Sequence, residues 1–341
     1  MAKIQVHLLD SIEFKEVALT IRSHPSVDRL DSHLVGRFGF LSRNYIQKMI
    51  REGTVLVNGL AVRPAKRIQI GDKIVLKVPV LPQRVIEPEP IELDIVHEDE
   101  DILVINKPPN LSCHAGRKYH GGTLANAIIY HLYGEEEGAG KNNPGIVHRL
   151  DKNTSGVIVI AKNSKTHRLL GWQFAQRHVG KEYLSLVKGR PQRNRGVIDA
   201  PVGWHPRKRS WMSVRMDSIN QKSAVTHYSV IERFQHGALV SLQPKTGRTH
   251  QLRIHMESIG HPMFGEDRYR GFYSLSHFDR SIGRQALHAH LLSFNHPTTD
   301  EQNTFEAELP PDFRRLISLL REETFDQPKP KSRVPRQTGG W

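Results

Sequence analysis

The segment GIVHRLDKNTSGVIVIAK, residues 145–162, joins a polar stretch to a continuous apolar run. The apolar run, residues 157–161, has the length and β-branched composition of a strand that is buried on both faces. The polar residues before it, His148 to Gly156, should therefore form a loop at the start of that strand. Loops held by a rigid strand are a common place for catalysis, so this junction directs the search for both fold and site.

Strand-like and helix-like runs are mixed along the larger part of the chain, which indicates an α+β domain. Four runs are strand-like: ILVIN, GVIVIAK, YLSLVKG and ALVSLQP. Two are helix-like, TLANAIIYHLY and TFEAELPPDFRRLISLLRE. Before them, Pro82, Pro88 and Pro90 disfavour a helix and predict an extended linker. The expected parts are an N-terminal segment 1–26, a compact unit 27–79, a linker 80–93, the large domain 94–325 and a basic, disordered tail 326–341.

The composition fits a soluble protein, either one with a polyanionic partner or an ordinary basic protein, and the charge alone does not decide between these. The 341 residues carry a formal net charge of +14, and such an excess favours binding to phosphates. The 38% apolar content is enough for a packed core. No run of 18 apolar residues and no signal peptide is visible, so we expect a cytoplasmic protein without membrane contact. The single cysteine, Cys113, excludes an intrachain disulfide and a cysteine-rich zinc site.

The unit 27–79 contains a basic helix followed by a hairpin. Ile46, Met49 and Ile50 have the spacing of a buried helix stripe, and Asn58-Gly59 fits a two-residue hairpin turn. The basic side chains near the helix could form one phosphate-binding surface or simply a solvated face. The order of RLDxxL, basic helix, VxVNG and GD before a strand resembles the S4 RNA-binding domain, a small α/β domain. By that resemblance, the candidate RNA contacts are Arg43, Lys48 and Arg51.

Three polar segments of the large domain are candidates for chemistry. In the first, Asp151 has basic neighbours that favour an ionised carboxylate, although an aspartate that only caps its own loop is an alternative. In the second, Tyr183 begins a strand, where it could stack on a base or simply pack. In the third, the apolar spacing predicts a helix over 249–258 that carries Arg253 among several basic residues. Its two histidines are five residues apart and do not share a face as a metal pair would, so no metal site is expected.

Together these segments closely resemble the RluA-type pseudouridine synthase family. The stretch HRLDKNTSG matches the family hallmark HRLDxxTSG. Further matches, in family order, are DILVINKPPNLSCHAG, KEYLSLVKG, KSAVTHY, TGRTHQLRIHMESIGHPMFGED and RQALHAHLLSFNHP. One departure is Asn110, where the family usually has glycine. The resemblance implies a mixed, largely antiparallel sheet with flanking helices, preceded by the S4-type domain.

The resemblance also implies a reaction and its residues. A pseudouridine synthase breaks the bond from ribose C1′ to uracil N1 and joins C1′ to C5, without a cofactor. Asp151 matches the catalytic aspartate, Arg253 the arginine that pairs with it, and Tyr183 the tyrosine that stacks on the uracil. Arg149, Arg248 and His250 are expected to contact RNA. A monomer acting on large-subunit ribosomal RNA is the first expectation and transfer RNA the second.

Two other classes of protein remain as alternatives. A non-catalytic RNA-binding or ribosome-assembly protein would need only the S4-like unit and the positive charge. A metal-dependent nuclease would need clustered acids, whereas the acid-rich pieces 97–101 and 134–138 look like solvated loops. The intact HRLD stretch, Tyr183 and Arg253 favour the isomerase over both.

Overall fold

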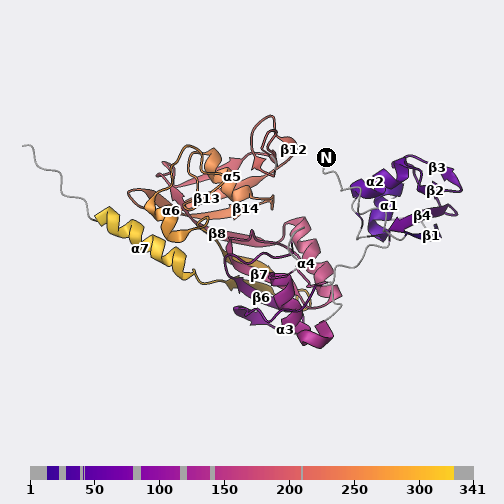
Figure 1. Cartoon of the computed structure of the whole chain (residues 1–341), viewed down its shortest axis with the longest axis horizontal. Helices are drawn as coiled ribbons and strands as arrows, with labels where there is room; N and C mark the ends of the chain where they lie inside the picture. Colours follow the sequence, from indigo (N-terminus) through magenta and orange to yellow (C-terminus); the bar gives the residue numbers. More distant parts are fainter. Residues whose placement is uncertain are drawn as a thin grey trace, which may run out of the picture. The chain divides into compact units, whose positions relative to one another are not determined.

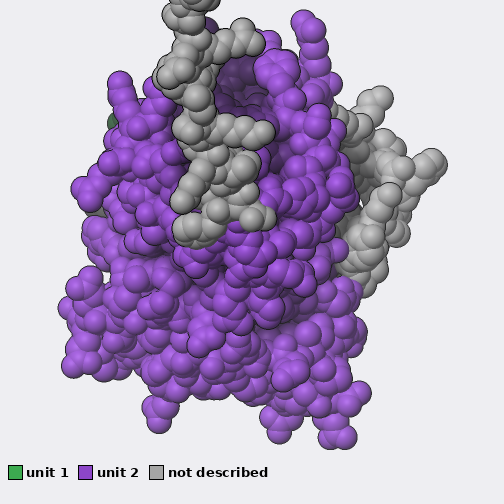
Figure 2. All heavy atoms as spheres, turned by 90° about the vertical axis from the view of Figure 1, so that its left-hand side faces the viewer, with its two compact units in different colours: residues 1–84 green, residues 85–341 purple. Residues whose placement is uncertain are grey.

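The computed structural model describes residues 14–22, 28–38, 41, 43–79, 86–115, 121–138, 143–208 and 210–325. The chain forms two compact units, residues 1–84 and 85–341, which Figure 2 colours separately. The division falls within the Pro-rich stretch 80–93. The expected tail, 326–341, lies outside the described residues. No described helix is both long and apolar enough to cross a membrane.

The first unit is a four-stranded antiparallel sheet with two helices (Figure 1). The helices are α1 (Leu30–Arg37) and α2 (Arg43–Arg51), and the strands, in sheet order, are β1 (Phe14–Thr20), β4 (Lys73–Pro79), β2 (Val55–Val57) and β3 (Leu60–Ala61). Strand β1 pairs with β4 along its whole length, so this part of the expected N-terminal segment belongs to the unit. Asn58 and Gly59 both adopt positive φ, 53° and 80°, as a two-residue hairpin turn requires.

The core of the first unit contains the predicted stripe of α2, since Ile46, Met49 and Ile50 are all buried. Beside it lies one buried carboxylate, Asp31, which is fully shielded from solvent. Its oxygens accept hydrogen bonds from Arg29 at 3.0 Å and Gln47 at 2.7 Å. These bonds, that from Arg29 above all, hold the pKa of Asp31 well below its usual range. The buried carboxylate of Asp31 on α1 therefore links this helix to α2 through Gln47.

The second unit is built on a nine-stranded mixed sheet (Figure 1). Its described strands pair antiparallel except at the contact between β7 and β15. The sheet order is β5 (Ile95–Glu98), β6 (Ile102–Lys107), β7 (Ser155–Ala161), β15 (Leu287–Asn295), β8 (Gly180–Lys188), β14 (Gly237–Pro244), β13 (Val225–Arg233) and β9 (Arg195–Asp199), with β16 (Gln302–Glu306) on β15. A small second sheet contains β10 (Val202–Trp204), β11 (Met212–Ser213) and β12 (Ile219–Lys222).

Five helices flank these strands in Figure 1: α3 (Leu124–Gly138), α4 (Ser164–Gln176), α5 (Gln251–Ser258), α6 (His277–Ile282) and α7 (Pro311–Phe325). Three expectations need correction. The helix-like run 304–322 is divided, because its first residues extend β16 and the helix starts at Pro311, a residue favoured in the first helical turn. Of the two acid-rich pieces expected to be loops, 97–101 begins inside β5, which ends at Glu98, and residues 135–137 lie in the last part of α3, after a kink at Gly134. Helix α5 begins at Gln251, two residues later than predicted.

The centre of the large sheet is a narrow seam between β7 and β15. Only His288 with Ser155 and Ala289 with Gly156 are in register there. Gly156 has φ 117°, and a Cβ atom on it would lie 2.2 Å from the carbonyl oxygen of Ala289. The glycine that ends the HRLDKNTSG stretch is therefore required by the close approach of two backbones. On the other side of Ala289, the pairing brings in Tyr183 of β8.

Asn110, the departure from the family pattern, lies in a turn and has a left-handed backbone. Asn110 adopts φ 65°, a left-handed conformation that glycine enters without strain. Asparagine is one of the few other residues that visit this region readily. The structure therefore places asparagine at a position where a glycine would also fit without strain.

We predict that Asp31→Asn loosens the first unit by about 1–2 kcal/mol, because charge-assisted hydrogen bonds to partly exposed arginines are lost and only weakly replaced. Amide hydrogen exchange in residues 43–79 should become faster. The control is Asp28→Asn, since Asp28 is half-exposed and its ion pair is with the exposed Arg67 at 3.4 Å. Equal exchange in the two variants would contradict the role given to Asp31.

Candidate active site

Asp151 lies in the loop that leads into β7, and its side chain is held from outside that loop. Its carboxylate is 23% exposed and accepts a hydrogen bond from Arg253, with 3.1 Å between Nη1 and Oδ2. The turn is closed by the backbone instead, because the amide of Thr154 donates to the carbonyl oxygen of Asp151 at 3.0 Å. The loop-capping alternative therefore does not describe this side chain.

Arg253, on α5, bridges Asp151 to a second carboxylate that is completely buried. Its Nε and Nη2 donate to the two oxygens of Glu266 at 2.7 and 2.6 Å. Burial is the largest single influence on the pKa of Glu266 and raises it, but the hydrogen bonds and positive charge of Arg253, together with two backbone amides, bring that pKa below its ordinary value. The backbone amide of Arg268 also donates to Glu266, at 3.0 Å. The guanidinium is thus fixed by two parallel bonds and presents its remaining Nη1 to Asp151.

His148 anchors the start of the Asp151 loop to β7. The amide of Val159 donates to its Nε2 at 3.0 Å, and its ring stacks on Phe174 of α4 with 4.5 Å between centroids. Burial lowers the pKa of His148 to about 3, so the ring stays neutral and keeps accepting this bond. The histidine of the HRLD stretch is therefore a structural residue.

Two buried cations hold the rest of the loop by its backbone carbonyls. The Nζ of Lys107 donates to the carbonyl of Lys152 at 3.2 Å, and Arg284 donates from Nη1 to that of Asn153 at 3.0 Å. Burial lowers the pKa of Lys107 to about 8. Arg284 is itself oriented by a two-pronged pair with Asp312, at 2.6 and 3.0 Å. The backbone on the C-terminal side of Asp151 is thereby constrained from two directions.

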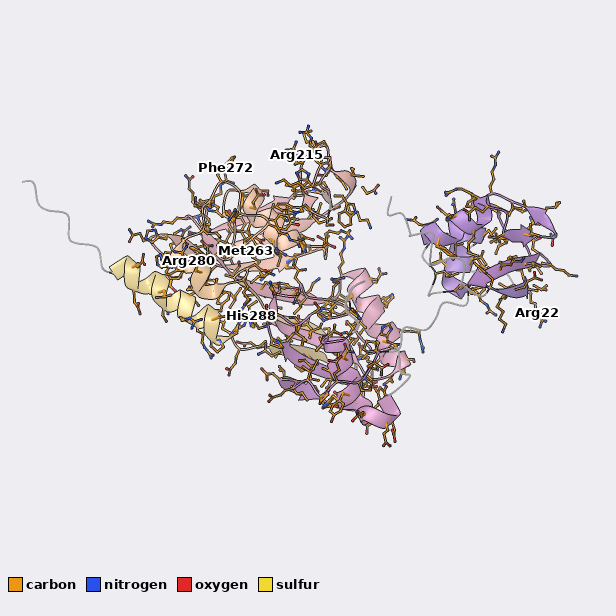
Figure 3. The ribbon with its side chains drawn as sticks, in the orientation of Figure 1. Arg22, Arg215, Met263, Phe272, Arg280 and His288 are labelled. Carbon is orange, nitrogen blue, oxygen red and sulfur yellow. The ribbon has the colours of Figure 1, made fainter. Side chains whose placement is uncertain are left out.

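Ser155 ends the loop with a further buried contact. Its hydroxyl lies 2.9 Å from Nδ1 of His288, a residue that Figure 3 labels in the second unit and that is fully buried. The second ring nitrogen of His288 lies 3.0 Å from the carbonyl of Ala307. The loop is therefore anchored at its start, along its length and at its end.

A pocket of about 140 Å³ opens beside Asp151, and Tyr183 lines it. Burial, with a smaller contribution from the carboxylate of Asp151, raises the pKa of Tyr183. The phenol therefore keeps its proton at neutral pH. Lys181, which precedes it on β8, also lines the pocket. The phenol ring and hydroxyl of Tyr183, the ammonium group of Lys181 and the carboxylate of Asp151 thus belong to residues that line one small pocket.

The three RNA candidates of the large domain, Arg149, Arg248 and His250, all line this pocket. Arg149 is exposed, and with Asp151 and Lys152 it also lines a second hollow. Arg248 donates from Nε to the carbonyl of Ser223 at 3.1 Å. His250 is mostly buried, with its Nε2 3.9 Å from Asp151.

The candidates of the first unit lie on or beside helix α2. Arg43 pairs with Asp31 at 3.2 Å while its side chain remains 53% exposed. Lys48 pairs with Glu52 at 3.6 Å, and Arg51 donates to Gln47 at 3.4 Å. All three stay accessible, but Arg43 also has a role within the fold.

The sequence reasoning missed three residues of this site: Glu266, Tyr269 and Lys181. Glu266 stands in the quoted GED stretch, and Tyr269 follows three residues later. An acid near a conspicuous arginine was the available signal, but nothing in the spacing of 13 residues shows that the two side chains meet. Among the described residues, no three histidine, cysteine or acidic side chains gather as metal ligands would.

Family models match both units of the chain. The model described as "RNA pseudouridylate synthase" matches residues 101–258, and the model described as "S4 domain" matches residues 28–74. Two solved human proteins have the same fold over most of their length. "RNA Pseudouridylate Synthase Domain Containing 4" is 28% identical with a TM-score of 0.54 and covers 67% of this chain and 92% of its own. "RNA Pseudouridylate Synthase Domain Containing 1" is 27% identical with a TM-score of 0.54 and covers 70% and 97%.

Bacterial relatives match nearly the whole chain. An "Uncharacterized RNA pseudouridine synthase" of Aquifex aeolicus is 42% identical over 87% of this chain and 95% of its own. A "Ribosomal large subunit pseudouridine synthase D" of Pseudomonas aeruginosa is 39% identical over 86% and 92%. The chain therefore belongs to the RNA pseudouridylate synthase family, and it carries an S4 domain in its first unit. It is an isomerase, and the expected fold class is confirmed.

We predict that Glu266→Gln destabilises the second unit by about 3 kcal/mol, because the buried guanidinium of Arg253 loses its compensating charge. Denaturant unfolding monitored by tryptophan fluorescence gives the change. The matched control is Asp267→Asn, since Asp267 lies 3.6 Å from the same guanidinium but is 79% exposed. That variant should keep the stability of the wild type, and a loss equal to that of Glu266→Gln would refute the assignment.

Proposed function

We propose that this synthase isomerises uridines of large-subunit ribosomal RNA, with Asp151 as the catalytic carboxylate. The observation that carries the proposal is the ion pair of Asp151 with Arg253 at the edge of a pocket lined by Tyr183. The ribosomal substrate is supported by the names of relatives such as that of Pseudomonas aeruginosa and by the S4 domain. Transfer RNA is the second candidate, because nothing in the pocket itself selects one RNA.

Asp151 would act on the target nucleotide after that nucleotide has left its stack, which costs a few kcal/mol. The reaction breaks the bond from C1′ to N1, joins C1′ to C5 and releases the C5 proton. Asp151 starts it either by adding covalently or by abstracting a ribose proton, and both routes need an ionised carboxylate. The pairing with Arg253 supports this state, since a positive charge at 3.1 Å favours the anion.

Tyr183 would hold the uracil while it is detached. Its ring lines the pocket, and base stacking on an aromatic ring is a common mode of RNA recognition. Because burial raises the pKa of its phenol, Tyr183 is better suited to donate a hydrogen bond than to remove the C5 proton. Arg149, exposed beside the carboxylate, would occupy the space that the extruded nucleotide leaves.

The remaining candidates would bind the rest of the RNA. Arg43, Lys48 and Arg51 in the first unit, and Arg248 in the second, are proposed to contact phosphates, which position an RNA without reading its sequence. We also propose that the enzyme works as a monomer in the cytoplasm without a metal ion or a cofactor. The isomerisation exchanges one bond for another with no redox change, so the protein's own side chains could suffice.

We predict that the protein releases tritium from ribosomal RNA labelled at uracil C5, because C5 must lose its hydrogen when it becomes the glycosidic carbon. Scintillation counting of the released water measures the rate. EDTA should leave it unchanged if no metal takes part. Release from transfer RNA but not from ribosomal RNA would overturn the proposed substrate, and release from neither would overturn the proposed function.

We predict that Asp151→Asn abolishes isomerisation while RNA affinity stays within about twofold, since size is kept and only the charge is lost. Arg253→Leu should lower the single-turnover rate severely, because it leaves the carboxylate without its partner. The double variant should be no slower than Asp151→Asn alone, because residues that act as one unit are not additive. Substantial turnover by Asp151→Asn would remove this residue from the mechanism. Circular dichroism must show that each variant is folded.

A further inference from the structure

His250 occupies a backbone conformation that its residue type does not favour. It precedes α5 with φ 55° and ψ 19°, in the left-handed region, and its side chain makes no capping bond to the helix. Glycine would enter this region without strain, whereas a residue with a Cβ atom pays roughly 1–2 kcal/mol. Such strain persists where the surroundings hold the residue in place, and it often marks a functional position. The contacts of the imidazole show what it does there.

The imidazole connects Tyr269 to the catalytic carboxylate. Its Nδ1 lies 2.7 Å from the hydroxyl of Tyr269, and its Nε2 lies 3.9 Å from Oδ2 of Asp151. Only 17% of the histidine side chain is exposed. Tyr269 is 5% exposed, and its ring also packs against the guanidinium of Arg253 at 5.2 Å. Both groups that approach Oδ2 of Asp151 therefore rest on the same tyrosine.

The hydrogen bonds of Tyr269 determine which nitrogen of His250 carries the proton. The backbone amide of Met212, in the small sheet, donates to the oxygen of Tyr269 at 3.2 Å. Because this oxygen already accepts one bond, the favoured arrangement is the one in which the hydroxyl of Tyr269 donates to Nδ1 of His250. Burial raises the pKa of Tyr269, so this proton is retained. A neutral imidazole that accepts at Nδ1 carries its own proton on Nε2, the nitrogen that faces Asp151.

Charges around His250 favour this neutral form. It faces one acid directly, Asp151, with Glu266 behind Arg253, and two cations, Arg253 and Arg268. Burial, which outweighs the opposing effect of Asp151, lowers the pKa of His250 below its ordinary value. At neutral pH the ring is therefore a hydrogen-bond donor toward Asp151.

We propose that His250, oriented by Tyr269, is a positioning residue that donates from Nε2 to Oδ2 of Asp151 once the target nucleotide is bound. Arg253 and His250 would then hold the same oxygen from two sides and leave Oδ1 as the reacting oxygen. The separation of 3.9 Å is too long for a hydrogen bond, but such bonds at catalytic groups are often long without substrate and shorten in the complex. This inference rests on the proposed role of Asp151, and it replaces the expectation that His250 contacts RNA.

The first test reads the tautomer directly and needs no activity. Long-range proton–nitrogen NMR of the full chain, with ¹⁵N-labelled histidine, shows which ring nitrogen of His250 is protonated. We expect Nε2–H in the wild type and a mixture of tautomers in Tyr269→Phe, which keeps the ring but lacks the hydroxyl. The control is Tyr273→Phe, since Tyr273 lies on the same loop and its hydroxyl donates to the backbone carbonyl of Gly260 at 3.4 Å, not to His250. Protonation on Nδ1 in the wild type would overturn the inference.

The second test separates the side chain from the backbone. His250→Gly relieves the left-handed strain but removes the hydrogen-bond partner of the buried Tyr269 hydroxyl, so the two effects oppose each other and stability should change little. Its single-turnover rate of tritium release should nevertheless fall roughly tenfold to hundredfold, as expected when a hydrogen bond to a charged group is lost. RNA affinity should stay unchanged. His250→Gln, whose amide can donate toward the same carboxylate, should recover part of the rate.

The outcomes distinguish this inference from the proposed function. If the wild type releases no tritium, the proposed function fails, while the NMR result still tests the orientation of His250. If the wild type is active and His250→Gly is equally fast, the inference alone fails. If His250→Gly loses RNA affinity at an unchanged rate of the bound complex, the histidine is an RNA contact, and the inference is again overturned.

Discussion

The guanidinium of Arg253 lies between two carboxylates of unequal exposure, and the arrangement of the site depends on that difference. Glu266 is buried and takes two of its nitrogens, so the guanidinium cannot turn. Asp151 is partly open and takes the third. Without Glu266 the buried guanidinium would lose both of its short parallel bonds and could adopt several orientations. With Glu266 in place, the guanidinium has one fixed orientation and can hold the carboxylate of Asp151 in position.

The loop that carries Asp151 is rigid for a related reason. Lys107 and Arg284 bind the carbonyls of Lys152 and Asn153, so the bonds depend on backbone position and not on the side chains of those two residues. Cations inside a protein are costly, and here each is compensated by several oxygen atoms. A reactive carboxylate needs such support, because small displacements from the productive geometry lower the rate steeply.

Features of the fold that depend on neighbouring residues were predictable from the sequence, whereas contacts between residues far apart in the sequence were not. The buried strand at 157–161, the stripe of α2 and the turn at Asn58 are set by neighbouring residues, and all three are confirmed. Contacts across the fold were accessible only through the family resemblance, which pointed to Arg253 as the partner of Asp151. Glu266 was missed because its meeting with Arg253 depends on how the segment after α5 turns back. The backbone strain at His250 could not be predicted either, because the spacing of apolar residues carries no information about the φ angle of one residue.

The close contact of β7 and β15 at Gly156 constrains the distance between the two halves of the site. The two backbones approach closely there with no side chain between them, and the paired strands leave no room for a Cβ atom at Gly156. Asp151 is attached to one side of the seam, through the start of β7, and Tyr183 to the other, through β8. The distance between the two residues that line the pocket therefore depends on how closely β7 and β15 approach each other at Gly156. Even the methyl group of an alanine at position 156 would push the two strands apart, and with them the carboxylate of Asp151 and the ring of Tyr183.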